Sequence, residues 1–173
     1  MVARISVGKN LYGALAYNQN KVDEGGAKVL SAHLLRYPED GRFRPDESVR
    51  QFLEWMPNHY RTEKPVIHIS LNPHPDDVLT DGQLAEIGRE YMQRLGYGNQ
   101  PYLVFKHEDI GRHHIHIVSL RVDSEGRKVS DKFEYRRSKE ITELLEQKYG
   151  LHPAEGRKKG EEWQLKPVDV AKG

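Results

Sequence analysis

Tyr102-Leu-Val-Phe-Lys106 and His114-Ile-His-Ile-Val-Ser-Leu-Arg-Val122 are two stretches in which β-branched, aromatic and other apolar residues dominate. Such composition is typical of strands. The link of residues 109–113 is short enough for a hairpin, and Asp123-Ser-Glu-Gly126 predicts a second tight turn into Arg127–Val129. The alternation of strands and helices also permits a parallel sheet, but two tight links favour antiparallel pairing.

Outward from this hairpin, short apolar strands alternate with amphipathic helices. Three further strands are expected at Val2–Val7, 28–36 and Pro65–Leu71. Helices are expected at Leu11–Asp23, at Asp46–Tyr60, from Thr80 or Asp81 to Leu95, and at Arg137–Tyr149. The predicted fold class is α/β of the α+β type, with a central antiparallel sheet of about five strands and helices packed on its faces. Residues 1–150 form the predicted domain, and residues 151–173 form a tail or the start of a linker.

Composition limits the class of protein. The 173 residues fit one domain, and 36% hydrophobic against 31% charged residues is typical of a soluble globular protein. The absence of cysteine excludes disulfides and thiolate metal sites. No stretch approaches the ~20 apolar residues that are needed to cross a bilayer. We therefore expect a cytoplasmic protein.

The formal net charge is only +1, so a DNA-binding surface has to come from the distribution of charge. Residues Arg112–Lys139 include eight Lys or Arg and four Asp or Glu, whereas acidic residues gather in Glu47–Glu63 and Asp76–Glu90. A single surface cation is usually only solvated, but this group predicts contact with phosphates. The candidate DNA-binding residues are Arg112, Arg121, Arg127, Lys128, Lys132, Arg136 and Arg137, with Phe133 and Tyr135 as aromatic side chains in the same stretch.

Three histidines whose side chains are expected on the same face lie within ten residues, at the ends of the two central strands. Side chains of a strand alternate between its faces, so His114 and His116 point the same way, with about 6.5–7 Å between their Cα atoms. An antiparallel neighbour that ends at His107 brings a third imidazole to the same place. Three neutral nitrogens with open coordination positions predict a catalytic site for a divalent metal ion. His113 falls on the opposite face, and His68 is expected to be structural.

The pattern His107-x-Asp109-x4-His114-x-His116 closely resembles the third motif of relaxases of the mobilisation-protein family, which are nucleases with a His-hydrophobic-His (HUH) signature. The spacing, the hydrophobic residue between the last two histidines and the following Ile-Val all fit. The resemblance implies an HUH-endonuclease-like fold for residues 1–150, most similar to relaxases of Bacteroides mobilisable elements. Many relatives have an asparagine shortly after the last histidine, where this chain has Ser119-Leu120-Arg121.

The nucleophile of that family is a tyrosine in a helix upstream of the histidines, and Leu15-Ala-Tyr-Asn-Gln-Asn-Lys21 resembles that segment. The resemblance implies Tyr17 as the nucleophile, whereas periodicity alone does not choose between Tyr17 and Tyr12. It further implies that the protein nicks one DNA strand at an origin of transfer, forms a 5′-phosphotyrosine link and uses Mg²⁺ or Mn²⁺. The implied partners are single-stranded DNA at the origin of transfer, accessory mobilisation proteins and a type IV coupling protein.

Two acidic residues follow the first histidine of the motif. If the strand continues to residue 109, the Asp109 side chain points to the same face as that of His107. We expect it to orient a ligand imidazole or to accept the tyrosine proton. Glu108 points the other way and is expected to be a solvated acid at the end of a strand.

Three other functions fit parts of this pattern. A rolling-circle replication initiator or transposase of the same chemistry has its tyrosine after the histidines, and Tyr135-Arg-Arg-Ser-Lys139 loosely resembles its Tyr-x-x-Lys arrangement with one residue too many. A metal-dependent phosphoesterase would use activated water and form no covalent adduct. A non-enzymatic binding module with a structural metal is disfavoured by the open set of three histidines.

Overall fold

The computed structural model describes residues 1–108 and 112–154. Its strands form one antiparallel sheet in the order β1-β3-β5-β4-β2. These strands are β1 (Val2–Gly8), β2 (Ala27–His33), β3 (Val66–Asn72), β4 (Tyr102–His107) and β5 (His114–Leu120). The helices are α1 (Leu11–Asp23), α2 (Pro45–Trp55), α3 (Asp81–Leu95) and α4 (Glu134–Tyr149). The predicted α+β class with a central antiparallel sheet is confirmed.

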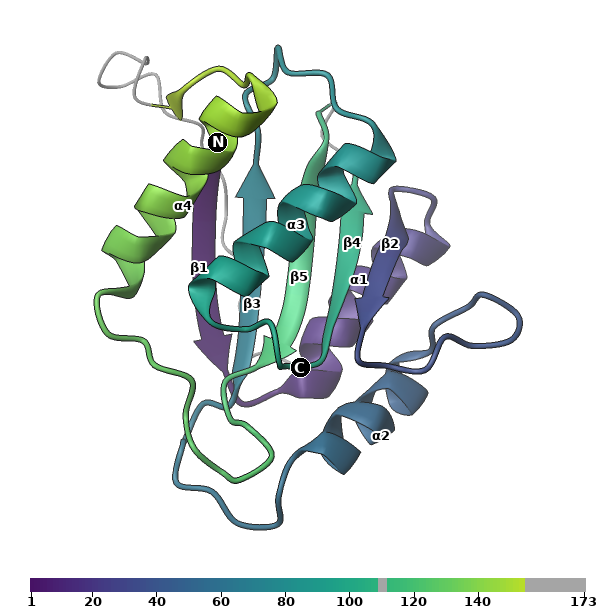
Figure 1. The fold of residues 1–173 in the computed structure, drawn as a ribbon. Helices are drawn as coiled ribbons and strands as arrows, with labels where there is room; N and C mark the ends of the chain where they lie inside the picture. Colours follow the sequence, from purple (N-terminus) through teal and green to yellow (C-terminus); the bar gives the residue numbers. More distant parts are fainter. Residues whose placement is uncertain (109–111, 155–173) are drawn as a thin grey trace.

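Helices cover both faces of the sheet. In Figure 1, α3 and α4 cross the near face, α1 lies behind the sheet, and α2 lies below the strands, with Phe52 in the same core as α1. The alternation of β5 explains the two layers: Ile115 and Ile117 belong to the core under α3 and α4, whereas Val118 and Leu120 belong to the core under α1 and α2. The side chains of His114 and His116 point to the same face of β5 as those of Val118 and Leu120, so they face α1 and α2.

Helix α3 supports β5 from the face opposite to the histidines. Its first turn is closed by a capping box, in which the Thr80 hydroxyl accepts from the Gln83 N–H and the Gln83 side chain accepts from the Thr80 N–H. Further along, Gly88 lies against β5 so closely that an added Cβ would sit 3.1 Å from the Ile115 Cδ1 atom. The glycine therefore allows α3 to approach the strand that carries two of the histidines.

Several predicted elements differ from the structure, and the strands expected at 28–36 and His114–Val122 end earlier, at His33 and Leu120. Helix α2 ends at Trp55 rather than at Tyr60, because Met56 takes an extended conformation before Pro57. The expected strand Arg127–Val129 is reduced to one isolated bridge between Val122 and Lys128. Helix α4 begins at Glu134, three residues earlier than expected.

The described chain ends shortly after α4. The predicted tail falls mostly on residues 155–173, which lie outside the described residues, so the predicted boundary at residue 150 stays a prediction. The first residues after α4 are bonded to the rest of the domain, because the His152 N–H donates to the Asp77 carboxylate and the Ala154 N–H donates to Glu146. Within the described ranges, no helix combines the length and apolar character needed to span a bilayer.

Candidate active site

The three predicted metal ligands lie together where β4 ends and β5 begins. His107 and His114 are direct partners across the two strands, and His116 follows on the same face of β5. One ring nitrogen from each of the three histidines lies within 4.8 Å of those of the other two, and all three side chains are buried. This His triad (His107, His114 and His116) can therefore offer three nitrogens to one ion.

The rings of the His triad are packed closely against one another. The His107 and His116 rings stack with centroids 3.8 Å apart, and the His116 Nε2 atom lies 3.1 Å from the His114 Nδ1 atom. Burial, followed by repulsion from the neighbouring histidines, holds the pKa of His116 well below its usual value. The neutral imidazole is the form that ligates a metal, so this set of donors fits a divalent ion of the kind that imidazole favours.

Tyr17 lies over the His triad. Its ring centroid is 6.1 Å from that of His107, 6.3 Å from that of His116 and 6.4 Å from that of His68. The Tyr17 side chain is on the flank of α1 and remains 40% exposed, so it combines contact with the site with access from solvent. Tyr12 is 53% exposed and makes no ring contact with a histidine in the described part of the chain. The structure thus distinguishes two tyrosines that periodicity could not separate.

Helix α1 is positioned by its cap and by its buried face. The Asn10 side chain accepts from the Gly13 N–H at 2.7 Å, which fixes the first turn. Leu11, Ala14 and Leu15 then pack into the core that α1 shares with the sheet. Because Tyr17 is set off from this stripe by the helical period, it points along the edge of α1 rather than into the core.

Two buried residues of the site were not predicted as functional. His68 on β3 was expected to be structural, but its Nε2 atom lies 3.2 Å from the His116 Nδ1 atom. Asn18 on α1 is fully buried, and its Oδ1 atom lies 2.8 Å from the His107 Nε2 atom. A signal for His68 was present in the sequence, since His68, Ser70 and Asn72 are polar residues that alternate with apolar ones along β3.

Acid is expected to destabilise the metal-free protein through His68. Burial, with a smaller contribution from His107, lowers the pKa of His68 to about 3. A histidine whose folded pKa lies below its unfolded value of about 6.5 contributes stability that is complete above that pH and is lost progressively as the pH falls toward 3. Between pH 7 and pH 5, we expect the free energy of unfolding in urea to fall by about 2 kcal/mol more in the wild type than in His68→Gln. An equal pH dependence in both proteins would contradict this assignment.

The structure describes only one of the two acidic residues that follow His107. Asp109 lies outside the described residues, so its predicted role stays a prediction. Glu108 is exposed, as expected, but it also pairs with the Lys106 ammonium at 2.7 Å. Lys106 is buried on the α3 side and pairs with Asp81 at 2.7 Å, which links the end of β4 to the start of α3. His113 is exposed beside Glu108 and is not part of the His triad.

The predicted DNA-binding residues lie at two ends of β5. Arg112 precedes His114 by two residues and is therefore at the end of the strand that holds the His triad. The other six follow Leu120 at the opposite end, which is about 20 Å away along a strand with a rise of about 3.3 Å per residue.

Two of the six distant residues are engaged in the fold. The Arg121 guanidinium is mostly buried and donates to the Lys64 carbonyl at 2.9 Å and to the Asp131 carboxylate at 3.1 Å. The Arg137 guanidinium donates to three backbone carbonyls, among them that of Leu95 at 3.0 Å. Both side chains therefore hold the segment between β5 and α4.

The other four distant residues are more exposed. Arg127 pairs with Asp123 and Glu125 of the preceding turn, and Lys128 pairs with Asp131. Lys132 and Arg136 lie against the ring of Phe133, at 5.6 Å and 4.4 Å from its centroid. The Phe133 ring is itself well exposed, so cations and an aromatic face are presented together at the start of α4.

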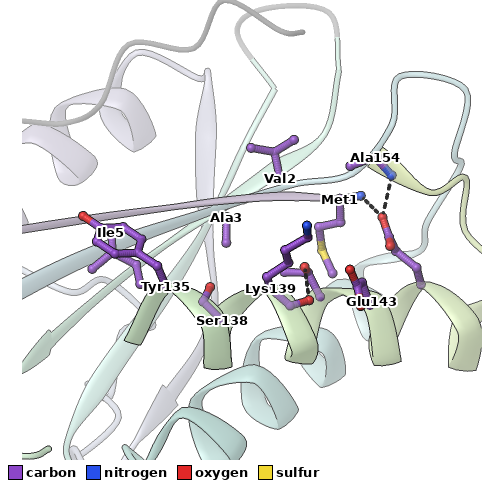
Figure 2. Close-up of a pocket in the computed structure, with 11 residues that line it drawn as sticks. Met1, Val2, Ala3, Ile5, Tyr135, Ser138, Lys139, Glu143 and Ala154 are labelled. Carbon is purple, nitrogen blue, oxygen red and sulfur yellow. Dashed lines mark hydrogen bonds and ion pairs between the residues drawn. The ribbon is translucent and has the colours of Figure 1, made fainter. Parts of the chain in front are cut away.

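A separate cavity lies between β1 and α4, on the face of the sheet away from the His triad (Figure 2). Its volume is about 220 Å³, and its lining includes Ala3 and Ile5 of β1 and Tyr135 of α4. At one end, the Met1 ammonium and the Ala154 N–H both bond to the Glu146 carboxylate. Of its lining residues, only Tyr135 was considered for function, as an aromatic side chain of the basic stretch and as the tyrosine of the replication-initiator alternative.

Three buried imidazoles beside an accessible tyrosine define a site suited to phosphodiester chemistry. The family model described as "Relaxase: MobA/VirD2-like, nuclease domain" matches residues 17–151. Because this match covers more than half of the chain, the protein belongs to the MobA/VirD2-like relaxase nuclease family. Membership supports a role as a nicking DNA endonuclease that binds single-stranded DNA. No curated protein matches the chain.

Proposed function

We propose that the protein is a relaxase that nicks one DNA strand at an origin of transfer, with Tyr17 as the nucleophile, and so initiates mobilisation of a plasmid or transposon. The observation that carries this proposal is the position of Tyr17, whose ring lies 6.1 Å from that of His107 and 6.3 Å from that of His116. The family match begins at this residue and includes the whole His triad.

In the proposed reaction the Tyr17 phenolic oxygen attacks the scissile phosphorus. A bond forms between this oxygen and phosphorus, the bond from phosphorus to the 3′-oxygen breaks, and the DNA remains attached as a 5′-phosphotyrosine. The phenolic proton passes to a base, for which Asp109 is the proposed candidate, and the departing 3′-oxygen takes up a proton. The link preserves the energy of the phosphodiester, so the strand can be rejoined by the reverse step.

The His triad is the proposed binding site for the metal that this reaction uses. A bound divalent ion, Mg²⁺ or Mn²⁺, would supply positive charge that offsets the charge developing on the scissile phosphate. Burial lowers the pKa of His116, which favours the neutral ring that can ligate the ion.

Single-stranded DNA is the proposed substrate. The basic residues proposed to contact it lie in two separate places. Arg112 is proposed to contact phosphates near the nick, because it lies beside the His triad along the chain. Arg127, Lys128, Lys132 and Arg136 are proposed to contact flanking DNA near Phe133. Arg121 and Arg137 are proposed to act mainly by holding that segment in place. Accessory mobilisation proteins and a type IV coupling protein are the proposed protein partners.

Trapping of the covalent intermediate tests this proposal. With labelled single-stranded oligonucleotides from the transfer origin of its element and with Mn²⁺, the protein should form an adduct that survives denaturing electrophoresis, and a chelator should abolish it. Peptide mapping should find the nucleotide on the peptide that contains Tyr17. An adduct on Tyr135 would instead indicate the order of residues found in replication initiators. Repeated cleavage with no adduct would indicate a phosphoesterase that uses water.

A further inference from the structure

Asn18 is a polar residue in the middle of the site, directly after Tyr17 in α1, and it is fully buried. Its amide nitrogen donates to the Ala14 carbonyl at 2.8 Å and lies 3.3 Å from the His68 Nε2 atom. Its amide oxygen lies 2.8 Å from the His107 Nε2 atom. Both ends of the side chain are therefore engaged, the amide nitrogen with the Ala14 carbonyl and His68 and the amide oxygen with His107.

The Ala14 carbonyl determines how the Asn18 amide is oriented. A carbonyl oxygen can only accept, so the amide nitrogen has to face it and the amide oxygen has to face His107. The His107 Nε2 atom must then carry a proton in order to donate to that oxygen. A neutral imidazole carries one proton, so the lone pair of His107 is on its Nδ1 atom.

The same reasoning extends through His68 to His116. The second N–H of the Asn18 amide points at the His68 Nε2 atom, which must accept and so carries the lone pair. The His116 Nδ1 atom lies 3.2 Å from this acceptor and must donate to it. The lone pair of His116 is consequently on Nε2, the atom that accepts from His114 Nδ1 at 3.1 Å and that a cation would take instead.

We propose that Asn18 is a positioning residue that, directly through His107 and indirectly through His68 and His116, sets which ring nitrogens of the His triad are available to a divalent cation. The inference rests on the proposed function in that it concerns the same metal site. Asn18 also follows the proposed nucleophile in the chain, so the same side chain holds α1 in a fixed position relative to the ligands. The helix that carries Tyr17 and the strands that carry the histidines are thereby joined by hydrogen bonds as well as by packing.

Binding of Mn²⁺ alone, measured by calorimetry in the absence of DNA, tests the proposal. Asn18→Leu keeps a side chain of similar size but can neither accept from His107 nor donate to His68. We expect its dissociation constant for Mn²⁺ to rise about 10- to 100-fold, the range typical when a partner of a ligating histidine is lost. Asn20→Leu, the same substitution at an exposed position of α1, should leave Mn²⁺ binding unchanged.

A destabilised variant separates positioning from general loss of stability. Leu15→Ala removes a buried apolar side chain from the same helix without touching the hydrogen bonds. It should lower the melting temperature and, at a temperature where it is folded, bind Mn²⁺ as the wild type does. The proposal is overturned if folded Asn18→Leu binds Mn²⁺ within about twofold of the wild type, or if Leu15→Ala weakens binding as strongly as Asn18→Leu.

A pair of substitutions at His68 keeps the proposal testable if Asn18→Leu does not fold. His68→Gln retains an oxygen that can accept from His116 Nδ1, whereas His68→Leu does not. Mn²⁺ binding should be weakened in the Leu variant and largely restored in the Gln variant, and equal binding by both would overturn the proposal. These measurements are independent of nicking, so a wild-type protein that binds Mn²⁺ but forms no adduct would contradict the proposed function alone. A wild-type protein that binds no Mn²⁺ would overturn the positioning role.

Discussion

Tyr17→Phe is expected to abolish both strand cleavage and the covalent adduct, with a loss of at least about 1,000-fold in rate, because the covalent step needs the phenolic oxygen. The substitution removes a single atom from a side chain that is 40% exposed. The free energy of unfolding should therefore change by less than about 0.5 kcal/mol. The measurement is the initial rate of adduct formation on a labelled oligonucleotide, together with Mn²⁺ binding by calorimetry, which should be unaffected.

Two other tyrosines provide matched controls for this substitution. Tyr12 lies on the same helix and Tyr135 lies on α4, and both are more exposed than Tyr17. Tyr12→Phe and Tyr135→Phe should retain cleavage and adduct formation. Cleavage that persists in Tyr17→Phe without any adduct would make water the attacking group, and the relaxase mechanism would have to be abandoned.

Alanine at His114 or His116 is expected to cause the second large loss, of about 100-fold or more in nicking, because each substitution removes one of three nitrogens that can ligate an ion. Metal analysis after dialysis should find less than one ion per chain in the single variants and none in the double variant. Circular dichroism and size-exclusion profiles should remain those of a folded protein.

His113→Ala is the control for this pair. His113 is the direct neighbour of His114, but its side chain is exposed and pairs with Glu108 rather than with the His triad. Metal content and nicking should therefore be unchanged. Retention of a stoichiometric ion by the double variant of His114 and His116 would show that the metal binds elsewhere.

The layout of the fold and the ligands of the candidate site could be predicted because they follow from local patterns. The alternation of β5 fixes the face of His114 and His116 without knowledge of any other strand. The short link between β4 and β5 then implies that His107 pairs opposite His114, as the structure shows. Asn10 and Thr80 cap α1 and α3, and both helices begin where these residues indicate.

His68 and Asn18 could not be predicted because their positions depend on long-range register. His68 pairs with Val118 in the antiparallel register of β3 and β5, which places it diagonally next to His116. A shift of this register by one residue would turn the side chain to the other face, and the sequence does not state the register. Asn18 reaches His107 only because α1 crosses the sheet at this point, which depends on the packing of the entire α1 layer.

The basic residues show a different limit of sequence reasoning. Their clustering between Arg112 and Arg137 suggested one surface, but β5 separates Arg112 from the others. The sequence also does not distinguish a cation that is free to meet phosphate from one that is bonded within the fold. Arg121 and Arg137 donate to backbone carbonyls of distant segments, a use that becomes visible only in the folded chain.

The central position of β5 also determines how readily each part of the site can open. The strand is flanked by β3 and β4 and covered on both faces, so its amide N–H groups lie within the hydrogen-bond ladders of the sheet. Amides of this kind generally exchange with solvent only when the whole domain unfolds, whereas surface elements open locally at lower free energy. His114 and His116 thus belong to the most slowly exchanging region of the molecule, and Tyr17 belongs to a helix at its surface. Local opening of α1 would therefore move the tyrosine only by breaking the hydrogen bonds of Asn18 to His107 and His68, while His114 and His116 stay in place.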